Sequence, residues 1–344
     1  MSVQEAHEKE NLRVAFAMQS DYLRAGLFNG NAMGRLSAIT DVATSGVLTE
    51  FSSERSRKVL EGVDVLITGW GSPTIDSRVL DTAPRLKLIA HAAGSVKGHV
   101  SPACWERGLA VTSAAAANAV PVAEYTLAAI LLAGKRAFTH AQTLRARPVP
   151  AHPDSLDPSL GNLGATVGII GASRIGRLVL EYLRPFGLRL LLADPTLTAA
   201  DAAALGAELV PLKQLMSESR VVSLHAPLLP GTVGMIGATE LAAMPDGSTF
   251  INTARGILVE AQALRAEAAS GRIHAVLDVT DPEPLPAGDP LYAMPNVFIT
   301  PHMAGSMGNE LHRMGDLITD EIHRFASGRP LKFDVTSQSL LAMA

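Results

Sequence analysis

The chain has 344 residues, of which 47% are hydrophobic and 18% charged, and its formal net charge is −4 at pH 7. This length favours two domains, and the hydrophobic content is enough for a sizeable core in each. The weak negative charge gives no reason to expect nucleic acid or a membrane surface as a partner, and a single cysteine, Cys104, excludes an internal disulfide and a cysteine-based metal cluster.

The first part of the chain alternates apolar runs with segments of helical spacing. Strands are predicted at 12–18, 63–68, 86–91 and 109–112, and helices at 53–61 and 77–83. Such alternation indicates a parallel, doubly wound sheet, whose ligands bind beyond the carboxyl ends of the strands. That rim carries the predicted substrate-binding residues Trp70, Gly71, Ala93, Gly94 and Ser95.

A long apolar stretch, Ala119 to Ala133, follows. It is too short to span a bilayer and contains Glu124, so we interpret it as a helix in a protein core that begins near Asn118. The polar, Pro-rich segment 145–162 predicts an exposed loop. The charged first residues lack the pattern of a signal peptide, and together with the single cysteine this favours a reducing compartment, the cytoplasm.

A second alternating series begins at Val167. Its strands are predicted at 167–170, 188–193, 207–210, 220–224, 248–251, 273–278 and 296–299. A final segment from Met307 to Phe325 has the spacing of an amphipathic helix. The predicted fold class is therefore α/β with two doubly wound parallel sheets.

A small-residue turn connects the first strand of this second series to a helix. Gly171 permits the tight turn, Gly176 lets the helix pack on the strand, and the helix N-terminus offers N–H groups to a pyrophosphate. Asp194 ends the next strand and can accept hydrogen bonds from both hydroxyls of an adenosine ribose. Ser173 replaces the second glycine of this dinucleotide-binding fingerprint. Its side chain either lowers the affinity for the dinucleotide or donates a hydrogen bond from its hydroxyl to the phosphate.

Three later strands deliver polar side chains to the same kind of rim. Arg255 has a planar guanidinium suited to binding a carboxylate and polarising the adjacent carbonyl. His302 can act as general acid and base, and Glu283 can hold its imidazole in one tautomer. Asp281 competes with Glu283 for that role, and Asp278 ends the strand before them. Beside a nicotinamide, this set would reduce a ketone.

From Leu12 to Val335 the chain resembles the D-2-hydroxyacid dehydrogenase family, which includes phosphoglycerate, glycerate and formate dehydrogenases. The matching motifs are GIIGASRIGR (168–177) with Asp194, VVSLHAPLLPGT (221–232), INTARGILVE (251–260), DVTDPEP (278–284) and TPHMAG (300–305). The resemblance implies Arg255, Glu283 and His302 as catalytic residues and Arg255 also as a substrate ligand. It implies NAD as the cofactor, bound by Gly171, Ser173, Arg174, Ile175, Gly176, Asp194, Pro227, Thr232, Thr253, Ala254 and Asp278.

The resemblance also implies how the chain is organised. Residues 1–115 and 305–344 would form a discontinuous, flavodoxin-like substrate domain, and 116–304 a Rossmann NAD-binding domain inserted into it. The protein would be a homodimer that moves a hydride between the nicotinamide and a 2-keto or D-2-hydroxy acid, with His302 as general acid and base. No metal, nucleic acid or membrane partner is expected.

The substrate loop departs from the family pattern. It usually resembles Gly-Val-Gly-x-Asp-Asn, whereas residues 93–98 read Ala-Gly-Ser-Val-Lys-Gly and Lys97 replaces the acid. The particular 2-hydroxy acid therefore stays open, and formate or phosphite are alternative substrates. A further alternative is a non-catalytic, NAD-sensing protein, since some family members act as transcriptional co-repressors; the complete set of arginine, glutamate and histidine disfavours it.

Overall fold

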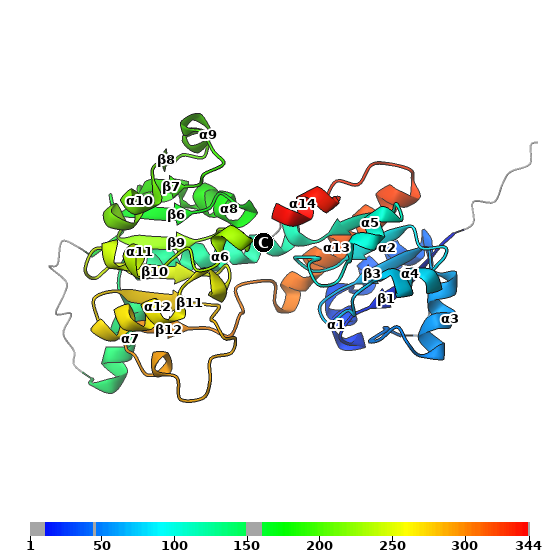
Figure 1. Ribbon diagram of the computed structural model, residues 1–344, viewed down its shortest axis with the longest axis horizontal. Helices are drawn as coiled ribbons and strands as arrows, with labels where there is room; N and C mark the ends of the chain where they lie inside the picture. Colours follow the sequence, from blue (N-terminus) through cyan, green and yellow to red (C-terminus); the bar gives the residue numbers. More distant parts are fainter. Residues whose placement is uncertain (1–10, 44–45, 149–159, 343–344) are drawn as a thin grey trace, which may run out of the picture. The chain divides into compact units, whose positions relative to one another are not determined.

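The computed structural model describes residues 11–43, 46–148 and 160–342. It consists of two compact units, each built around one sheet (Figure 1). Met1–Asn118 and Met307–Met343 form the first, which we call the terminal unit, and Ala119–Ser306 form the second, the central unit. The central unit is therefore inserted into the terminal unit in the sequence.

The terminal unit contains a parallel five-stranded sheet in the order β2-β1-β3-β4-β5. Its strands are β1 (Leu12–Ala17), β2 (Thr40–Val42), β3 (Val65–Thr68), β4 (Leu88–His91) and β5 (Ala110–Ser113). This order is flavodoxin-like, which confirms the predicted fold class for this part. The sequence does not predict β2, because its three residues form no apolar run and pairing with β1 alone defines it.

Helices cover both faces of this sheet, as a parallel sheet requires. One face carries α1 (Asp21–Leu27), α2 (Gly30–Ser37) and α13 (Leu311–Ala326), and the other α3 (Glu54–Gly62), α4 (Ser77–Thr82) and α5 (Pro102–Glu106). Alternate residues of β1 serve the two layers, with Phe16 in the first core and Ala17 in the second. The last helix in the described residues is α14 (Ser337–Ala342).

Gly315 sets the distance at which α13 packs. A Cβ at this position would overlap the carbonyl oxygen of Leu27, whereas a Cβ at Gly34 in α2 would meet open space. We expect Gly315→Ala to lower the free energy of unfolding by about 3 kcal/mol because the helix must move. Gly34→Ala is the matched control and should raise it by up to about 1 kcal/mol. Urea unfolding that finds both variants equally stable would contradict this packing.

The central unit contains a parallel seven-stranded sheet in the order β12-β11-β10-β9-β6-β7-β8, visible as a continuous stack in Figure 1. Its strands are β6 (Thr166–Ile170), β7 (Arg189–Ala193), β8 (Glu208–Leu209), β9 (Val221–Leu224), β10 (Thr249–Asn252), β11 (His274–Leu277) and β12 (Val297–Ile299). The strand order reverses between β6 and β9. In sheets of this kind, ligands bind at that reversal, outside the carboxyl ends of the strands.

Helices also cover both faces of the central sheet. α10 (Leu212–Glu218), α11 (Ala238–Ala243) and α12 (Ala261–Ser270) pack on one face, and α6 (Ala115–Ala133), α8 (Arg174–Leu183) and α9 (Ala199–Ala204) on the other. Neighbouring residues of β10 again point to opposite layers, Phe250 to the first and Ile251 to the second. The central unit is thus a doubly wound α/β sheet, as predicted.

Two predicted boundaries need correction. α6 begins at Ala115 rather than near Asn118, because its first turn packs into the core of the terminal unit through Ala117. A further helix, α7 (Ala137–Ala146), extends into the predicted loop 145–162, since the Phe138 ring stacks on Phe298 with centroids 4.5 Å apart. Residues 149–159 of that loop, like the first ten residues, lie outside the described part of the chain.

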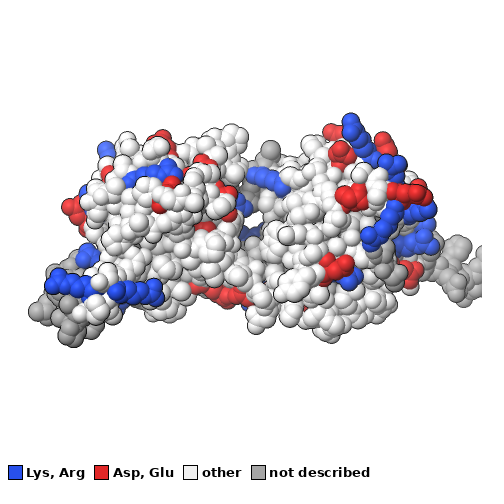
Figure 2. Space-filling view, turned by 90° about the horizontal axis from the view of Figure 1, so that it is seen from below, with Lys and Arg blue, Asp and Glu red and all other residues white. Residues whose placement is uncertain are grey.

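Within the described residues, α6 is the helix long and apolar enough to cross a membrane. Ala123 and Ile130 of this helix are buried in the core against β6, and 44% of its most apolar 18-residue stretch is buried. We therefore interpret α6 as a core helix with one partly exposed apolar side. Figure 2 shows a molecular face that is mostly uncharged, with basic and acidic side chains close to one another.

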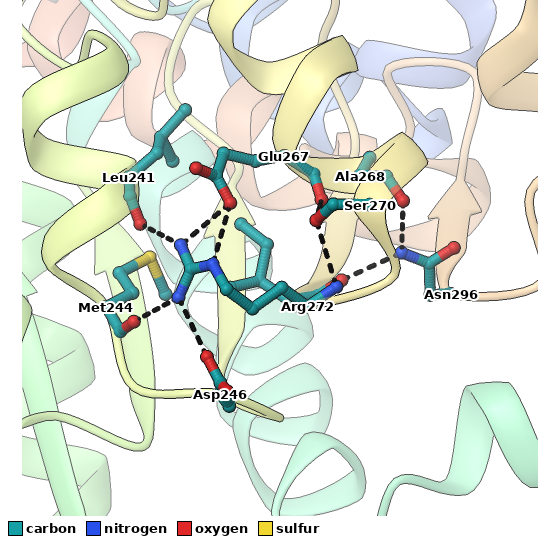
Figure 3. A network of polar contacts seen from close by, with 9 residues as sticks. Leu241, Met244, Asp246, Glu267, Ala268, Ser270, Arg272 and Asn296 are labelled. Atoms are coloured by element: carbon teal, nitrogen blue, oxygen red, sulfur yellow. Dashed lines mark hydrogen bonds and ion pairs between the residues drawn. The ribbon is translucent and has the colours of Figure 1, made fainter.

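Arg272 connects α11 and α12 near the amino ends of β10 and β11 (Figure 3). Its guanidinium donates to the carbonyl oxygens of Leu241, at 2.7 Å, and Met244, and to the Glu267 carboxylate, at 2.7 Å. It thereby gives the Leu241 carbonyl oxygen, which already accepts from the Met244 N–H at 3.2 Å, a second donor and ties α11 to α12. Asn296 adds a bond of 2.9 Å to the carbonyl oxygen of Ala268. The carboxyl ends of the same strands stay available for chemistry.

Candidate active site

The turn between β6 and α8 needs glycine at two positions, for different reasons. Gly171 has φ of +89°, and a Cβ there would lie 2.7 Å from the backbone of Ala226. A Cβ at Gly176 would overlap the carbonyl oxygen of Gly171. The helix can therefore approach the strand closely enough to present its N-terminus at the switch point of the sheet.

Ser173 is the N-cap of α8. Its Oγ accepts a hydrogen bond of 3.3 Å from the Gly176 N–H, a role that the glycine fingerprint does not predict. A hydroxyl that accepts in this way keeps its own hydrogen for donation. The first-turn N–H groups of Arg174 and Ile175 lie at the helix end, where a phosphate is favoured. This donor set fits a pyrophosphate.

Asp194 follows β7 and is already held by the protein. One carboxylate oxygen accepts from the Ala172 N–H at 2.7 Å, and the other from the N–H and hydroxyl of Thr196 at 2.9 and 2.6 Å. Burial alone would raise the pKa of Asp194, but these hydrogen bonds outweigh it and the pKa lies below its usual value. Of its roughly four acceptor positions, one is left for a ribose hydroxyl unless Thr196 turns away.

Arg255, Glu283 and His302 lie beyond the carboxyl ends of three neighbouring strands, β10, β11 and β12. His302 Nδ1 and Glu283 Oε1 are 2.5 Å apart, and both side chains are partly exposed, by 49% and 41%. Burial lowers the pKa of Arg255, and the charge of Glu283 acts against that shift. The structure thus brings together the three side chains that the sequence predicts to be catalytic.

The His302 backbone is left-handed, with φ of +53°. Side chains other than glycine adopt this conformation only where neighbouring groups hold it. Here the His302 N–H donates to the carbonyl oxygen of Asp278 at 2.9 Å, and the Asp278 carboxylate accepts from the N–H groups of Met303 and Ala304 at 2.8 and 3.0 Å. Asp278, for which the family resemblance implies a nicotinamide contact, therefore also shapes the turn that carries His302.

Asn252, the last residue of β10, is a site residue that the sequence reasoning missed. Its side chain accepts from the Ala254 N–H at 3.0 Å and donates to the carbonyl oxygen of Arg255 at 2.9 Å. Arg255 in turn donates to the carbonyl oxygen of Ala254 at 2.6 Å, and Thr253 is buried with its hydroxyl 3.1 Å from that of Thr126. An asparagine at a strand end is a known turn former and was the available signal.

Two predicted cofactor residues, Pro227 and Thr232, close one turn after β9. The Thr232 hydroxyl donates to the carbonyl oxygen of Pro227 at 2.7 Å and accepts from the Leu229 N–H at 2.9 Å. The hydroxyl of Thr232 therefore stabilises the turn. A cofactor that binds here would contact the turn rather than this hydroxyl alone.

The predicted substrate-binding residues of the terminal unit follow β3 and β4, which are adjacent. Trp70 is half-buried and packs against the core on the α1 side, while Ala93 is fully buried. Gly94 and Ser95 are half-buried, and Ser95 Oγ accepts from the Lys97 N–H at 3.3 Å. Trp70 therefore has a packing role beside any contact with a ligand.

Two further histidines at strand ends are buried and serve packing. Burial, together with the nearby His99, lowers the pKa of His91 to about 3, and burial lowers that of His225 to about 3. His91 Nδ1 lies 2.8 Å from the Thr68 hydroxyl, and His225 Nε2 lies 2.9 Å from that of Ser223. Both rings are therefore neutral at pH 7. Within the described residues, no group of three or more metal-ligating side chains is present.

Comparisons with known proteins show the family to which the chain is related. The family model of the D-isomer specific 2-hydroxyacid dehydrogenase NAD binding domain matches residues 127–304. A crystal structure of a protein from Thermus thermophilus is 34% identical, with a TM-score of 0.74 over 94% of this chain and 100% of its own.

Curated relatives extend the similarity beyond the central unit. The glyoxylate reductase of Korarchaeum cryptofilum is 32% identical over 282 residues, which cover 79% of this chain and 84% of that protein. The D-3-phosphoglycerate dehydrogenase of Mycobacterium leprae is 33% identical over 258 residues, which cover 74% of this chain; this chain spans about half of that protein, 48%. The chain belongs to the D-isomer specific 2-hydroxyacid dehydrogenase family, and its central unit contains the NAD-binding domain of that family.

Proposed function

We propose that the protein is an NAD-dependent oxidoreductase that interconverts a 2-keto acid and a D-2-hydroxy acid. The observation that carries this proposal is the 2.5 Å contact between His302 and Glu283, with Arg255 close enough for its pKa to respond to Glu283. These side chains share the carboxyl edge of the sheet that also presents the glycine-rich turn. The set supplies a proton donor, its orienting carboxylate and a carboxylate-binding cation.

Each side chain has a distinct task in reduction. When bound, NADH supplies the hydride that adds to the carbonyl carbon. Arg255 holds the substrate carboxylate and stabilises the alkoxide that develops on the adjacent oxygen. Glu283 accepts a hydrogen bond from Nδ1 of His302, which orients the ring and leaves Nε2 to protonate that oxygen. In oxidation the neutral imidazole takes the proton back.

The two units would divide the work. We assign the NAD-binding domain to residues 116–304, with the predicted cofactor residues around β6, β7, β9 and β10. We assign substrate binding to 1–115 and 305–344, with the backbone N–H groups of Gly94 and Ser95 and the side chain of Trp70 as ligands. The chain has one cysteine, the buried Cys104, and this low cysteine usage fits the cytoplasmic location that we propose.

Asp194 should make the protein prefer NADH to NADPH. Neither Pro195 nor Thr196, which follow it, offers a positive charge to a 2′-phosphate, and the carboxylate repels that group. We expect Asp194→Asn, which keeps the shape, to lower kcat/KM for NADH about tenfold, since a hydrogen bond to a charged group is lost. The same change should raise kcat/KM for NADPH, since the repulsion of its 2′-phosphate is removed. Equal efficiency of the unaltered protein with both cofactors would contradict this role.

We also propose that the protein is a homodimer formed through the central unit, with α6 near the two-fold axis. The partly exposed side of α6 carries Ala128 and Leu132, the latter 44% exposed, which a second copy would cover. Sedimentation velocity at micromolar concentration should show a species of twice the 36.1 kDa chain mass. A single species of chain mass would argue against the dimer.

The direct test of the proposed function is a panel of 2-keto acids incubated with NADH while its absorbance is followed. The panel contains glyoxylate and keto acids with charged and with apolar side chains, because Lys97 in the substrate loop leaves the particular substrate open. Turnover of any of them excludes a purely NAD-sensing role. NAD reduction by formate or phosphite, without turnover of any keto acid, would redirect the proposal to another small anion.

A further inference from the structure

Tyr125 of α6 contacts the turn that bears His302 through a chain of hydroxyl groups. Its Oη lies 2.8 Å from Oγ1 of Thr300, and Thr300 Oγ1 donates to an Asp278 carboxylate oxygen at 2.7 Å. A threonine hydroxyl has one hydrogen, which is used on Asp278, so Tyr125 must be the donor to Thr300. The direction of the whole chain, from Tyr125 to Thr300 to Asp278, is therefore fixed.

Asp278 connects this chain of hydroxyl groups to the turn that carries His302, the proposed proton donor. The oxygen that accepts from Thr300 also accepts the Met303 N–H, and the second oxygen accepts the Ala304 N–H. Asp278 is 2% exposed, so these protein groups are its main stabilisation. Residues on both sides of His302 thus donate hydrogen bonds to one carboxylate. Loss of one donor therefore changes the hydrogen bonds that the remaining donors make to it.

The surroundings keep Tyr125 in the donor state. Its ring packs against the core formed by α6, α8 and β6, which leaves the hydroxyl as the polar end. Burial, with a smaller effect from the Asp278 charge, raises the pKa of Tyr125 above its usual value even though Thr300 acts against the shift. The hydroxyl hydrogen is consequently present across the pH range in which a dehydrogenase works.

We propose that Tyr125 is a positioning residue, which acts through Thr300 and Asp278 to hold the left-handed turn that presents His302. The proposal rests on the proposed role of His302 as proton donor. The strain of φ at +53° makes such support necessary, because the turn would otherwise relax and displace the imidazole. A displacement of about 1 Å in a reacting group is enough to lower a rate up to a hundredfold.

Three variants separate this role from simple packing. Tyr125→Phe and Thr300→Val each remove one hydroxyl and keep the shape of the side chain, while Thr300→Ser keeps the hydroxyl. We expect the first two to lower kcat about tenfold with KM for NADH within about twofold of the unaltered protein, and the serine variant to restore kcat. Tyr22→Phe, at a side chain 90% exposed, is the control for losing a tyrosine hydroxyl.

Hydrogen exchange of the Met303 and Ala304 amides gives a readout that needs no activity. These amides should exchange faster in Tyr125→Phe and Thr300→Val than in Thr300→Ser. Unchanged exchange, or a valine variant whose kcat equals that of the serine variant, would overturn the proposal. Should Tyr125→Phe not fold, the Thr300 pair decides. Should the unaltered protein reduce no keto acid, the proposed function fails, and the exchange rates alone decide whether the hydroxyl chain holds the turn.

Discussion

Replacing His302 should lower keto acid reduction by about three to four orders of magnitude while NADH still binds, because the loss is confined to proton transfer in the transition state. His302 is not part of the glycine-rich turn, where the cofactor phosphates are proposed to bind. The dissociation constant of NADH, measured by fluorescence titration, should therefore stay close to that of the unaltered protein.

The choice of replacement matters because His302 lies in the left-handed region, with φ of +53°. Alanine is strained there, whereas asparagine tolerates this conformation, and its side-chain amide cannot act as a general acid or base near neutral pH. Both His302→Ala and His302→Asn should be inactive, but only the alanine variant should lose stability. His323→Ala, at an exposed position of α13, is the control. Near-normal turnover in His302→Asn would contradict the proposed mechanism.

Removing the charge of Glu283 should have the second largest effect. In Glu283→Gln an amide oxygen can still accept from Nδ1 of His302, but the carboxylate that stabilises the imidazolium is gone. We expect kcat to fall about 100-fold, because general acid catalysis depends on the donor being both oriented and charged. Stopped-flow measurement of a single turnover would place the loss in the chemical step rather than in product release.

Asp281 offers a matched control for this variant. It lies two positions before Glu283, is exposed, and is the other acid that the sequence allows for the same role. Of these two acids, Glu283 is the one whose side chain contacts the His302 ring. Asp281→Asn makes the same change of charge and should leave kcat within about twofold, since an exposed charge away from the ring is screened. A larger loss in Asp281→Asn than in Glu283→Gln would transfer the role to Asp281.

Those elements that bury apolar side chains could be predicted from the sequence. Most strands of the two sheets are apolar runs, and the amphipathic spacing at 307–325 corresponds to α13, which begins at Leu311. β2 could not be predicted, because the pairing of Thr40–Val42 with β1 is a property of the folded sheet. The predicted start of α6 lies three residues too late, because the first turn of α6 is stabilised by a core to which residues far along the chain, such as Met314 and Ile318, also contribute.

For the candidate site, motifs predicted which side chains gather but not how they are held. Arg255, Glu283 and His302 could be identified because each follows a strand within a recognisable motif. The contacts of Asp278 with Met303 and Ala304, and of Tyr125 with Thr300, join residues up to 175 positions apart and leave no local pattern. The capping bond between Ser173 and Gly176 is different, because it spans three positions and a serine before a helix is a local signal for an N-cap.

The measurement that tests the central claim most directly is transfer of deuterium from NADH deuterated at both C4 positions to the keto acid with the highest turnover, glyoxylate excepted because its product has no D configuration. Mass spectrometry and chiral chromatography of the product should find one deuterium at C2 of a D-2-hydroxy acid, formed at a rate that falls by about three orders of magnitude or more in His302→Asn. A product without deuterium at C2, or an equal rate in the variant, would contradict hydride transfer assisted by His302.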